Sequence, residues 1–217
     1  MRVVIIVDDY VIEKIDPRLE EILKSGKPIH YERLKKTVGL SEGRMIGLSH
    51  VKTPYFLLLD DDFIFTQRTD IAKLFEIIKS TNLGLVAGNT DECNFFGIHK
   101  YVKIDKSRVL EQYEKHSFGT LKDHPDCYHV DIAKNFFVGK LNLVLEVGGW
   151  TRYLMVAEHE DLFIKLKLKN IPVAVCPSVT IDHKQVNDRI RLQRKYSYIY
   201  FHKLLKEKWK LDEIKHL

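Results

Sequence analysis

The stretch YFLLLDDDFIF, residues 55–65, is an apolar run that meets three consecutive aspartates, Asp60, Asp61 and Asp62, and then resumes. An apolar run without alternation predicts a strand buried on both faces, as in a parallel sheet. Adjacent carboxylates at its end repel one another unless a positive group lies among them. Ligands of open α/β sheets bind at this end of the strands, so a divalent cation such as Mg2+ or Mn2+ is the simplest partner. A solvated, Asp-rich turn is the alternative.

Length and composition set the class of protein. The chain has 217 residues, 45% of them hydrophobic and 30% charged, which suits one globular domain. A net charge of +5 fits an anionic small molecule such as a nucleotide and is too diffuse to indicate nucleic acid. Cys93, Cys127 and Cys176 match no zinc spacing and no disulfide framework, so we expect a reducing compartment. We see no signal peptide or membrane-length apolar segment and expect a cytoplasmic protein.

Strand-like and helix-like segments alternate, which predicts an α/β fold with a mostly parallel central sheet flanked by helices. The apolar run 3–7 predicts a second central strand. Helices are predicted over residues 16–23, 41–48, 69–78, 141–147 and 158–168, and further strands over 29–34, 85–88, 135–139, 173–176 and 179–183. The segment 94–128 shows no clear period, and the tail 188–217 is mostly helical by pattern.

Polar residues at the ends of these elements are candidates for one site. They are Asp8, Asp9, the aspartate triplet, Glu160, Asp161 and His183. Arg44, near the start of a predicted helix, would suit a phosphate, although an ordinary surface arginine explains it equally well. Charge complementarity at a helix N-terminus would likewise explain Glu160 and Asp161 without any catalytic role.

With these residues in place, the chain resembles the GT-A glycosyltransferases, which use nucleotide-sugar donors. The similarity is greatest to the beta-1,4-N-acetylgalactosaminyltransferases and related bacterial-type inverting enzymes, and it covers about residues 3–185. The matching pieces occur in the family's order: VDD at 7–9, GRM at 43–45, LDDDFIFT at 59–66, NFF at 135–137, VGGW at 147–150, VAEHED at 156–161 and DH at 182–183. The ordered set is fairly specific, although each piece alone is weak.

The resemblance implies a single GT-A (Rossmann-like) domain. A nucleotide-binding half would cover about residues 1–90, an acceptor half about 91–187 and a basic helical tail 188–217. The family carries one more strand and helix before the strand at 3–7, and an Asn where Met45 stands. We therefore expect part of the pocket for the nucleotide base to be missing or rebuilt.

The resemblance also implies roles for the donor-side residues. Asp8 or Asp9 would lie by the uracil base, and Arg44 near the diphosphate or the uridine. The triplet resembles the family's DxD motif. In it Asp60 would face the ribose and reach the metal, Asp61 would belong to the nucleotide site, and Asp62 would bind Mn2+ or Mg2+. His183 resembles the histidine on the metal or pyrophosphate side.

On the acceptor side, Gly148, Gly149 and Trp150 resemble a wall on which an aromatic face can cover a sugar. Glu160 and Asp161 match the family's Glu-Asp pair, whose acid is the general base of inverting enzymes. We favour Asp161 as the base, with Glu160 orienting the acceptor, although the residues leave this choice open. In this chemistry a divalent cation stabilises the departing diphosphate, and a carboxylate takes the proton of the attacking hydroxyl.

Together these features predict a metal-dependent, inverting glycosyltransferase that moves a sugar from a nucleotide donor, a UDP-sugar, to a glycan or other hydroxyl acceptor. A haloacid-dehalogenase-type phosphatase fits the triplet loosely but leaves the VGGW and VAEHED pieces unexplained. A degenerate, non-catalytic subunit that binds nucleotide or glycan is the other alternative. The basic tail could fold over the donor phosphates or make peripheral contact with an anionic membrane, while a solvated terminal helix is the more ordinary interpretation.

Overall fold

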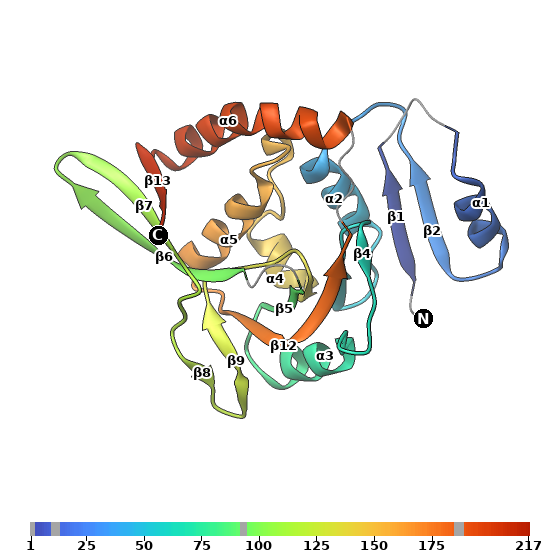
Figure 1. Cartoon of the computed structure of the whole chain (residues 1–217), viewed down its shortest axis with the longest axis horizontal. Coiled ribbons are helices and arrows are strands. Elements are labelled where there is room, and N and C mark those ends of the chain that lie inside the picture. Colours follow the sequence, from blue (N-terminus) through green and yellow to red (C-terminus); the bar gives the residue numbers. More distant parts are fainter. Residues whose placement is uncertain (1–2, 10–13, 92–94, 185–188) are drawn as a thin grey trace.

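A computed structural model of the chain describes residues 3–9, 14–91, 95–184 and 189–217 (Figure 1). Its helices are α1 (Pro17–Lys24), α2 (Leu40–Ser49), α3 (Ile71–Ser80), α4 (Leu141–Glu146), α5 (Glu158–Leu168) and α6 (Arg189–Trp209), with a 3-10 turn η1 (Arg152–Leu154). Its strands are β1 (Val4–Asp8), β2 (Ile29–Arg33), β3 (Tyr55–Leu58), β4 (Phe63–Ile64), β5 (Leu85–Thr90), β6 (Phe96–Ile104), β7 (Ser107–Glu114), β8 (Thr120–Leu121), β9 (His124–Val130), β10 (Ile132–Ala133), β11 (Phe137–Lys140), β12 (Val173–His183) and β13 (Glu213–His216).

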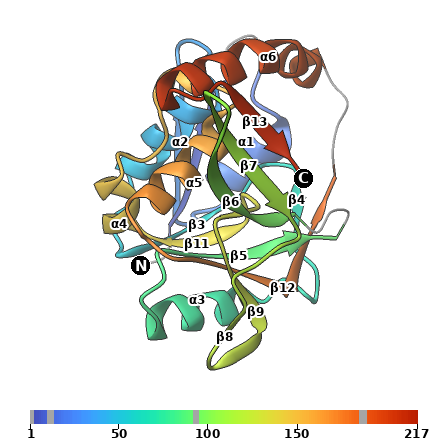
Figure 2. The same ribbon diagram turned by 90° about the vertical axis from the view of Figure 1, so that its left-hand side faces the viewer.

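The main sheet has seven strands in the order β3-β11-β5-β12-β9-β8, with β4 paired to the end of β12. The helix α3 lies on one side of this sheet, and α2, α4 and α5 lie on the other, beneath α6 (Figure 2). The mixed α/β class is as predicted. The sheet itself is not mostly parallel: β5 and β12 run parallel, but β11 runs antiparallel between β3 and β5, and β9 runs antiparallel to β12. An apolar run predicts burial but carries no information about the direction of its neighbour.

The core forms because the central strands are apolar on both faces. On β5, Leu85 and Ala87 pack into the cluster under α5, while Val86 packs into the cluster under α3. The same alternation places Val175 of β12 on the α5 side and Ala174 on the α3 side. The helices supply matching apolar faces, so each layer buries the next.

Two strands do not lie where the sequence predicts them. The strand β3 is the half-buried edge of the main sheet and not a central strand. The strand β1 pairs in parallel with β2 in a separate two-stranded sheet, to one side of the main sheet (Figure 1). One face of β1 packs on α2 at Gly47, next to Ile5 and Val7, but Val4 stays 57% exposed. The strand formed by the apolar run is therefore packed on one face only.

The segment without a sequence period, 94–128, forms strands in its described part. The strands β6 and β7 make an antiparallel hairpin, and β13, at the end of the tail, adds to β7 in parallel. The tail is helical as predicted over α6 before it ends in this strand. Within the described residues, none of the helices is both long enough and apolar enough to cross a membrane.

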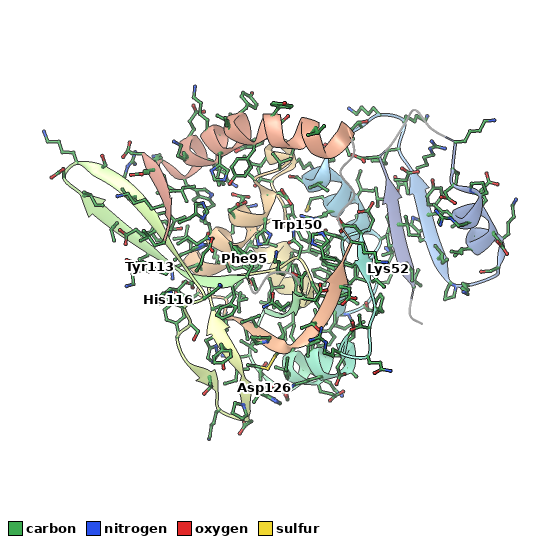
Figure 3. The ribbon with its side chains drawn as sticks, in the orientation of Figure 1. Lys52, Phe95, Tyr113, His116, Asp126 and Trp150 are labelled. Atoms are coloured by element: carbon green, nitrogen blue, oxygen red, sulfur yellow. A yellow bond between two sulfur atoms is a disulfide. The ribbon has the colours of Figure 1, made fainter. Side chains whose placement is uncertain are left out.

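A disulfide joins Cys127 of β9 to Cys176 of β12, beside Asp126 (Figure 3). The expectation that the cysteines form no disulfide is therefore wrong, and the argument for a reducing compartment loses its basis. The register of the two strands explains the bond, because Val175 lies opposite Tyr128 and the two cysteines occupy the next positions. Sequence spacing could not show this, since the cysteines are 49 residues apart. Cys93 lies outside the described residues.

We expect reduction of this disulfide to lower the free energy of unfolding by about 2–4 kcal/mol, because the bond restricts a long loop of the unfolded chain. Denaturant unfolding with and without a reducing agent measures this difference. The double variant Cys127→Ser, Cys176→Ser is the control, since the reducing agent should not change its stability. A wild type with equal stability in both conditions would contradict the prediction.

Candidate active site

The aspartate triplet lies in the turn between β3 and β4. There β4 pairs with the end of β12, which sets Phe63 opposite His183. This register brings the His183 Nε2 to 3.0 Å from the Asp62 Oδ2, although 121 residues separate them. Lys184 N also donates to the Asp62 backbone oxygen at 2.9 Å, which holds the two chain segments together. Asp61 is exposed on the turn.

The Asp62–His183 pair fits the metal implied by the resemblance. A carboxylate oxygen and an imidazole nitrogen at this separation can bind one divalent cation, and the oxygens of a diphosphate or water can complete the set. Asp60 is not engaged in this way, because its Oδ1 accepts a hydrogen bond from Arg44 at 2.8 Å. The structure therefore brings together two of the three predicted metal ligands.

Arg44 links two of the sequence motifs instead of facing a phosphate. Its guanidinium, only 10% exposed, donates to Asp60 on one side and to Glu158 at the start of α5 on the other. Burial alone would lower the pKa of Arg44, but these two carboxylates raise it. Arg44 thus carries a fixed positive charge that joins the β3 end to α5. The predicted contact with the diphosphate is not supported by this arrangement.

A cavity of about 320 Å3 opens beside the triplet. Its lining residues are Leu40, Asp60, Phe63, Thr90, Phe95, Lys134, Asn135, Val156, Glu158, His159, Glu160 and His183. Its volume is at the lower end of the range for small-molecule sites. Of the predicted residues, Asp60, Glu160 and His183 line this cavity.

Glu160 presents a carboxylate at this cavity. Its side chain is 18% exposed, and its Oε1 lies 3.8 Å from the His202 Nε2 of α6. Burial alone would raise the pKa of Glu160, but the nearby His202 favours the carboxylate, and the pKa is lowered. Glu160 is therefore ionised at neutral pH and can accept a proton.

Asp161 points away from the cavity and is fully buried. Its two oxygens accept hydrogen bonds from the Thr151 hydroxyl at 2.6 Å, the Lys208 ammonium at 2.5 Å and the Trp209 indole at 2.9 Å. The Lys165 ammonium lies 3.0 Å away. A carboxylate with this many partners and no exposure holds α6 against α5. It has no room for an acceptor hydroxyl, so the preference for Asp161 as the base does not fit this geometry.

The predicted acceptor wall lies in the core. Trp150 is 2% exposed and packs edge-on against Phe56, in the middle of the molecule (Figure 3). Gly148 and Gly149 end α4 with φ of 77° and 55°, which turns the chain inward. A Cβ on Gly149 would lie 2.4 Å from the Met45 sulfur, so this glycine allows α2 to pack closely. None of the three residues lines the cavity. Their predicted role as a wall of the acceptor site therefore does not agree with the structure.

Asp8 and Asp9 are engaged within the protein. Asp8 accepts a hydrogen bond from the Tyr31 hydroxyl at 2.6 Å, and burial together with this bond raises the pKa of Tyr31 to about 12. Asp9 accepts from the Gly39 backbone N at 2.8 Å, at the start of α2. Both lie at the carboxyl end of β1, as predicted, but neither lines the cavity. Their contact with a base stays a prediction.

Sequence reasoning missed two residues of the cavity wall, Asn135 and His159. The Asn135 Oδ1 and the His159 Nε2 are buried and have no hydrogen-bond partner within the described parts of the chain. Burial lowers the pKa of His159 to about 4, so its ring is neutral at pH 7. Buried polar atoms normally have partners, and these two face a cavity, so a ligand or ordered water is their expected partner. Asn135 belongs to the NFF piece and His159 to the VAEHED piece. Membership of these pieces is the only indication of the two residues in the sequence.

Comparison with known proteins identifies the class. Residues 3–133 match the model of glycosyl transferase family 2, and the chain belongs to this family. The chain is 30% identical over 166 residues to human beta-1,4 N-acetylgalactosaminyltransferase 1, a match that covers 73% of this chain and 31% of that protein. It is 29% identical over 176 residues to mouse beta-1,4 N-acetylgalactosaminyltransferase 2, covering 81% of this chain and 34% of that one. The chain thus spans about a third of the length of these relatives.

Solved structures show the same fold at low sequence identity. GalNAc-T7, crystallised with UDP, GalNAc and Mn2+, superposes with a TM-score of 0.62 at 14% identity, over 84% of this chain and 38% of that chain. Staphylococcus aureus TarS, residues 1–349, gives 0.55 at 12% identity, over 83% and 50% of the two chains. The resemblance to GT-A glycosyltransferases is therefore confirmed at the level of fold and family.

Proposed function

We propose that the chain catalyses metal-dependent, inverting transfer of a sugar from a UDP-sugar to a hydroxyl acceptor. The observation that carries this proposal is one cavity lined by both Glu160 and His183, with Asp62 lying 3.0 Å from His183. A candidate base and one residue of the candidate metal pair thus line the same cavity. The named activity of the relatives, together with the UDP, GalNAc and Mn2+ of GalNAc-T7, supports UDP-N-acetylgalactosamine as the first donor to test.

Each of these residues has a separate role in the proposed reaction. A cation held by Asp62 and His183 would offset the negative charge of the departing diphosphate. Glu160 accepts the proton of the acceptor hydroxyl while that oxygen attacks the anomeric carbon. The bond from this carbon to the diphosphate oxygen breaks as the new bond forms on the opposite face, so the configuration inverts. Asn135 and His159 bind hydroxyl or amide groups of the sugar, which satisfies their buried polar atoms.

The match of residues 3–133 to glycosyl transferase family 2 leaves the phosphatase alternative without support. A degenerate, non-catalytic subunit that binds nucleotide or glycan is the other function that the same site could serve. It predicts binding of a nucleotide sugar without turnover, so binding and turnover must be measured separately.

The variant Asp62→Ala is expected to lose at least about tenfold in Mn2+-dependent affinity for a UDP-sugar, because it removes one of two protein ligands of the metal. Calorimetric titration of a panel of nucleotide sugars, with Mn2+ or with a chelator, measures this and identifies the donor. Asp123→Ala, in the exposed turn before β9, is the matched control and should bind like the wild type. If the wild type binds no nucleotide sugar with or without metal, the proposed function is wrong. If it binds but does not turn over, the chain is a binding subunit.

A further inference from the structure

A second group of metal-type ligands lies at the far end of α2 from the cavity. His30 and Glu32 are two residues apart on β2 and therefore share one face of the strand. His50 directly follows α2 as its C-cap residue. One ligand atom from each of the three side chains lies within 4.8 Å of the other two. Leu40, at the other end of α2, lines the cavity, so about 15 Å of helix separates the two places.

The geometry of the group goes beyond an ordinary ion pair. The His50 Nε2 lies 2.6 Å from the Glu32 Oε2, and the His30 Nε2 lies 4.0 Å from the same oxygen. The two imidazole rings are 4.0 Å apart between centroids. A His50–Glu32 hydrogen bond alone would explain two of these residues. It leaves unexplained why a second imidazole lies against the first with its nitrogen near the same carboxylate.

We propose that His30, Glu32 and His50 bind a zinc-type divalent cation. Two imidazole nitrogens and one carboxylate oxygen are a common protein set for zinc, with water in the fourth position. The ligands of a tetrahedral zinc ion lie about 3.3 Å apart, which small side-chain rotations can reach from the observed separations. Two imidazole ligands favour zinc over Mg2+ or Mn2+, whereas the Asp62–His183 pair supplies only one imidazole.

The position of the group indicates a structural effect of the bound ion. The sheet of β1 and β2 already contacts the start of α2, where Asp9 accepts from the Gly39 backbone N at 2.8 Å. A cation bridging β2 to His50 would attach the same sheet to the other end of the helix. Between 32% and 44% of each of the three side chains is exposed, so an ion can enter from solvent. Zinc should therefore raise the Tm, because it binds the folded chain in preference to the unfolded one.

The test titrates metal-free protein with Zn2+ in the background Asp62→Ala, His183→Ala, which removes the pair at the cavity. We expect one Zn2+ per chain, and His30→Ala and His50→Ala should each weaken its binding at least about tenfold. The control is His116→Ala, which removes an exposed histidine that follows β7 and should leave binding unchanged. Absorption of Co2+ in place of Zn2+ reports the coordination directly.

His50→Ala also breaks a hydrogen bond, so circular dichroism must show that each variant is folded. His30→Ala keeps the test decisive, since its contact with Glu32 is too long for a hydrogen bond. Absence of Zn2+ binding in the background protein, or binding that both substitutions leave unchanged, would overturn the proposal. The experiment uses no nucleotide sugar, so its outcome is independent of the proposed transferase activity.

Discussion

Replacing Glu160 by Gln is expected to lower kcat by about 10²–10⁴-fold, with the affinity for the donor nearly unchanged. The substitution keeps the shape of the side chain but removes the carboxylate that we propose accepts the proton of the acceptor hydroxyl. The proposed metal ligands Asp62 and His183 stay in place, so calorimetric titration should show unchanged binding of the nucleotide sugar. Initial rates over a range of donor and acceptor concentrations measure the loss in kcat.

The pH profile provides a second check of the same role. The pKa of Glu160 is lowered from its ordinary 4.5, so the carboxylate persists at neutral pH and is lost only as the pH falls below that value. The acid limb of kcat/KM for the wild type, which reports the free enzyme, should therefore lie below pH 4.5. Glu146→Gln, an exposed glutamate of α4, is the matched control and should keep the wild-type rate. Wild-type kcat in Glu160→Gln would exclude Glu160 as the base.

Replacing Asp161 by Ala is expected to destabilise the fold by about 3–5 kcal/mol, because it leaves two partly buried ammonium groups without their fully buried carboxylate. Lys165 and Lys208 both contact this side chain, and burial already lowers the pKa of Lys165. The change also removes the acceptor of the Trp209 indole, so α6 should separate from α5 more easily. Denaturant unfolding measures the loss of stability, and limited proteolysis reports the release of α6.

Glu207→Ala on α6 is the control for this prediction. Its carboxylate is 59% exposed and 3.8 Å from Lys203, so its loss should cost less than about 1 kcal/mol. The isosteric Asp161→Asn distinguishes the structural role from a catalytic one. If that variant keeps wild-type stability and donor binding but loses turnover, Asp161 is the base and our assignment to Glu160 is wrong.

The acidic start of α5 shows why a motif alone could not assign roles. Successive residues of a helix point about 100° apart, so neighbouring acids face different surroundings. Glu158 bonds to Arg44, Glu160 faces the cavity near His202, and Asp161 lies among the cations of α5 and α6. The resemblance predicted functional residues in this segment, and two of its acids, Glu158 and Glu160, line the cavity. The division of the segment into three separate environments depends on α2 and α6, which are distant in sequence.

The sequence by itself determined most of the helices, several of the strands and the family. Helix starts such as Asp16-Pro17, the apolar runs and the ordered motifs depend on local periodicity and residue type, and the structure and the family match confirm them. The pairing of Asp62 with His183 also followed from motif order through the resemblance, although its geometry required the register of β4 and β12.

Only the tertiary structure decided which polar groups face the cavity and which are buried in the core. It buried Trp150 and Asp161, paired Cys127 with Cys176, and placed His30 and Glu32 beside His50. Each of these results depends on strand register or helix docking between segments far apart in the chain. Local patterns carry no information about such contacts, because burial and partnership are properties of the assembled layers.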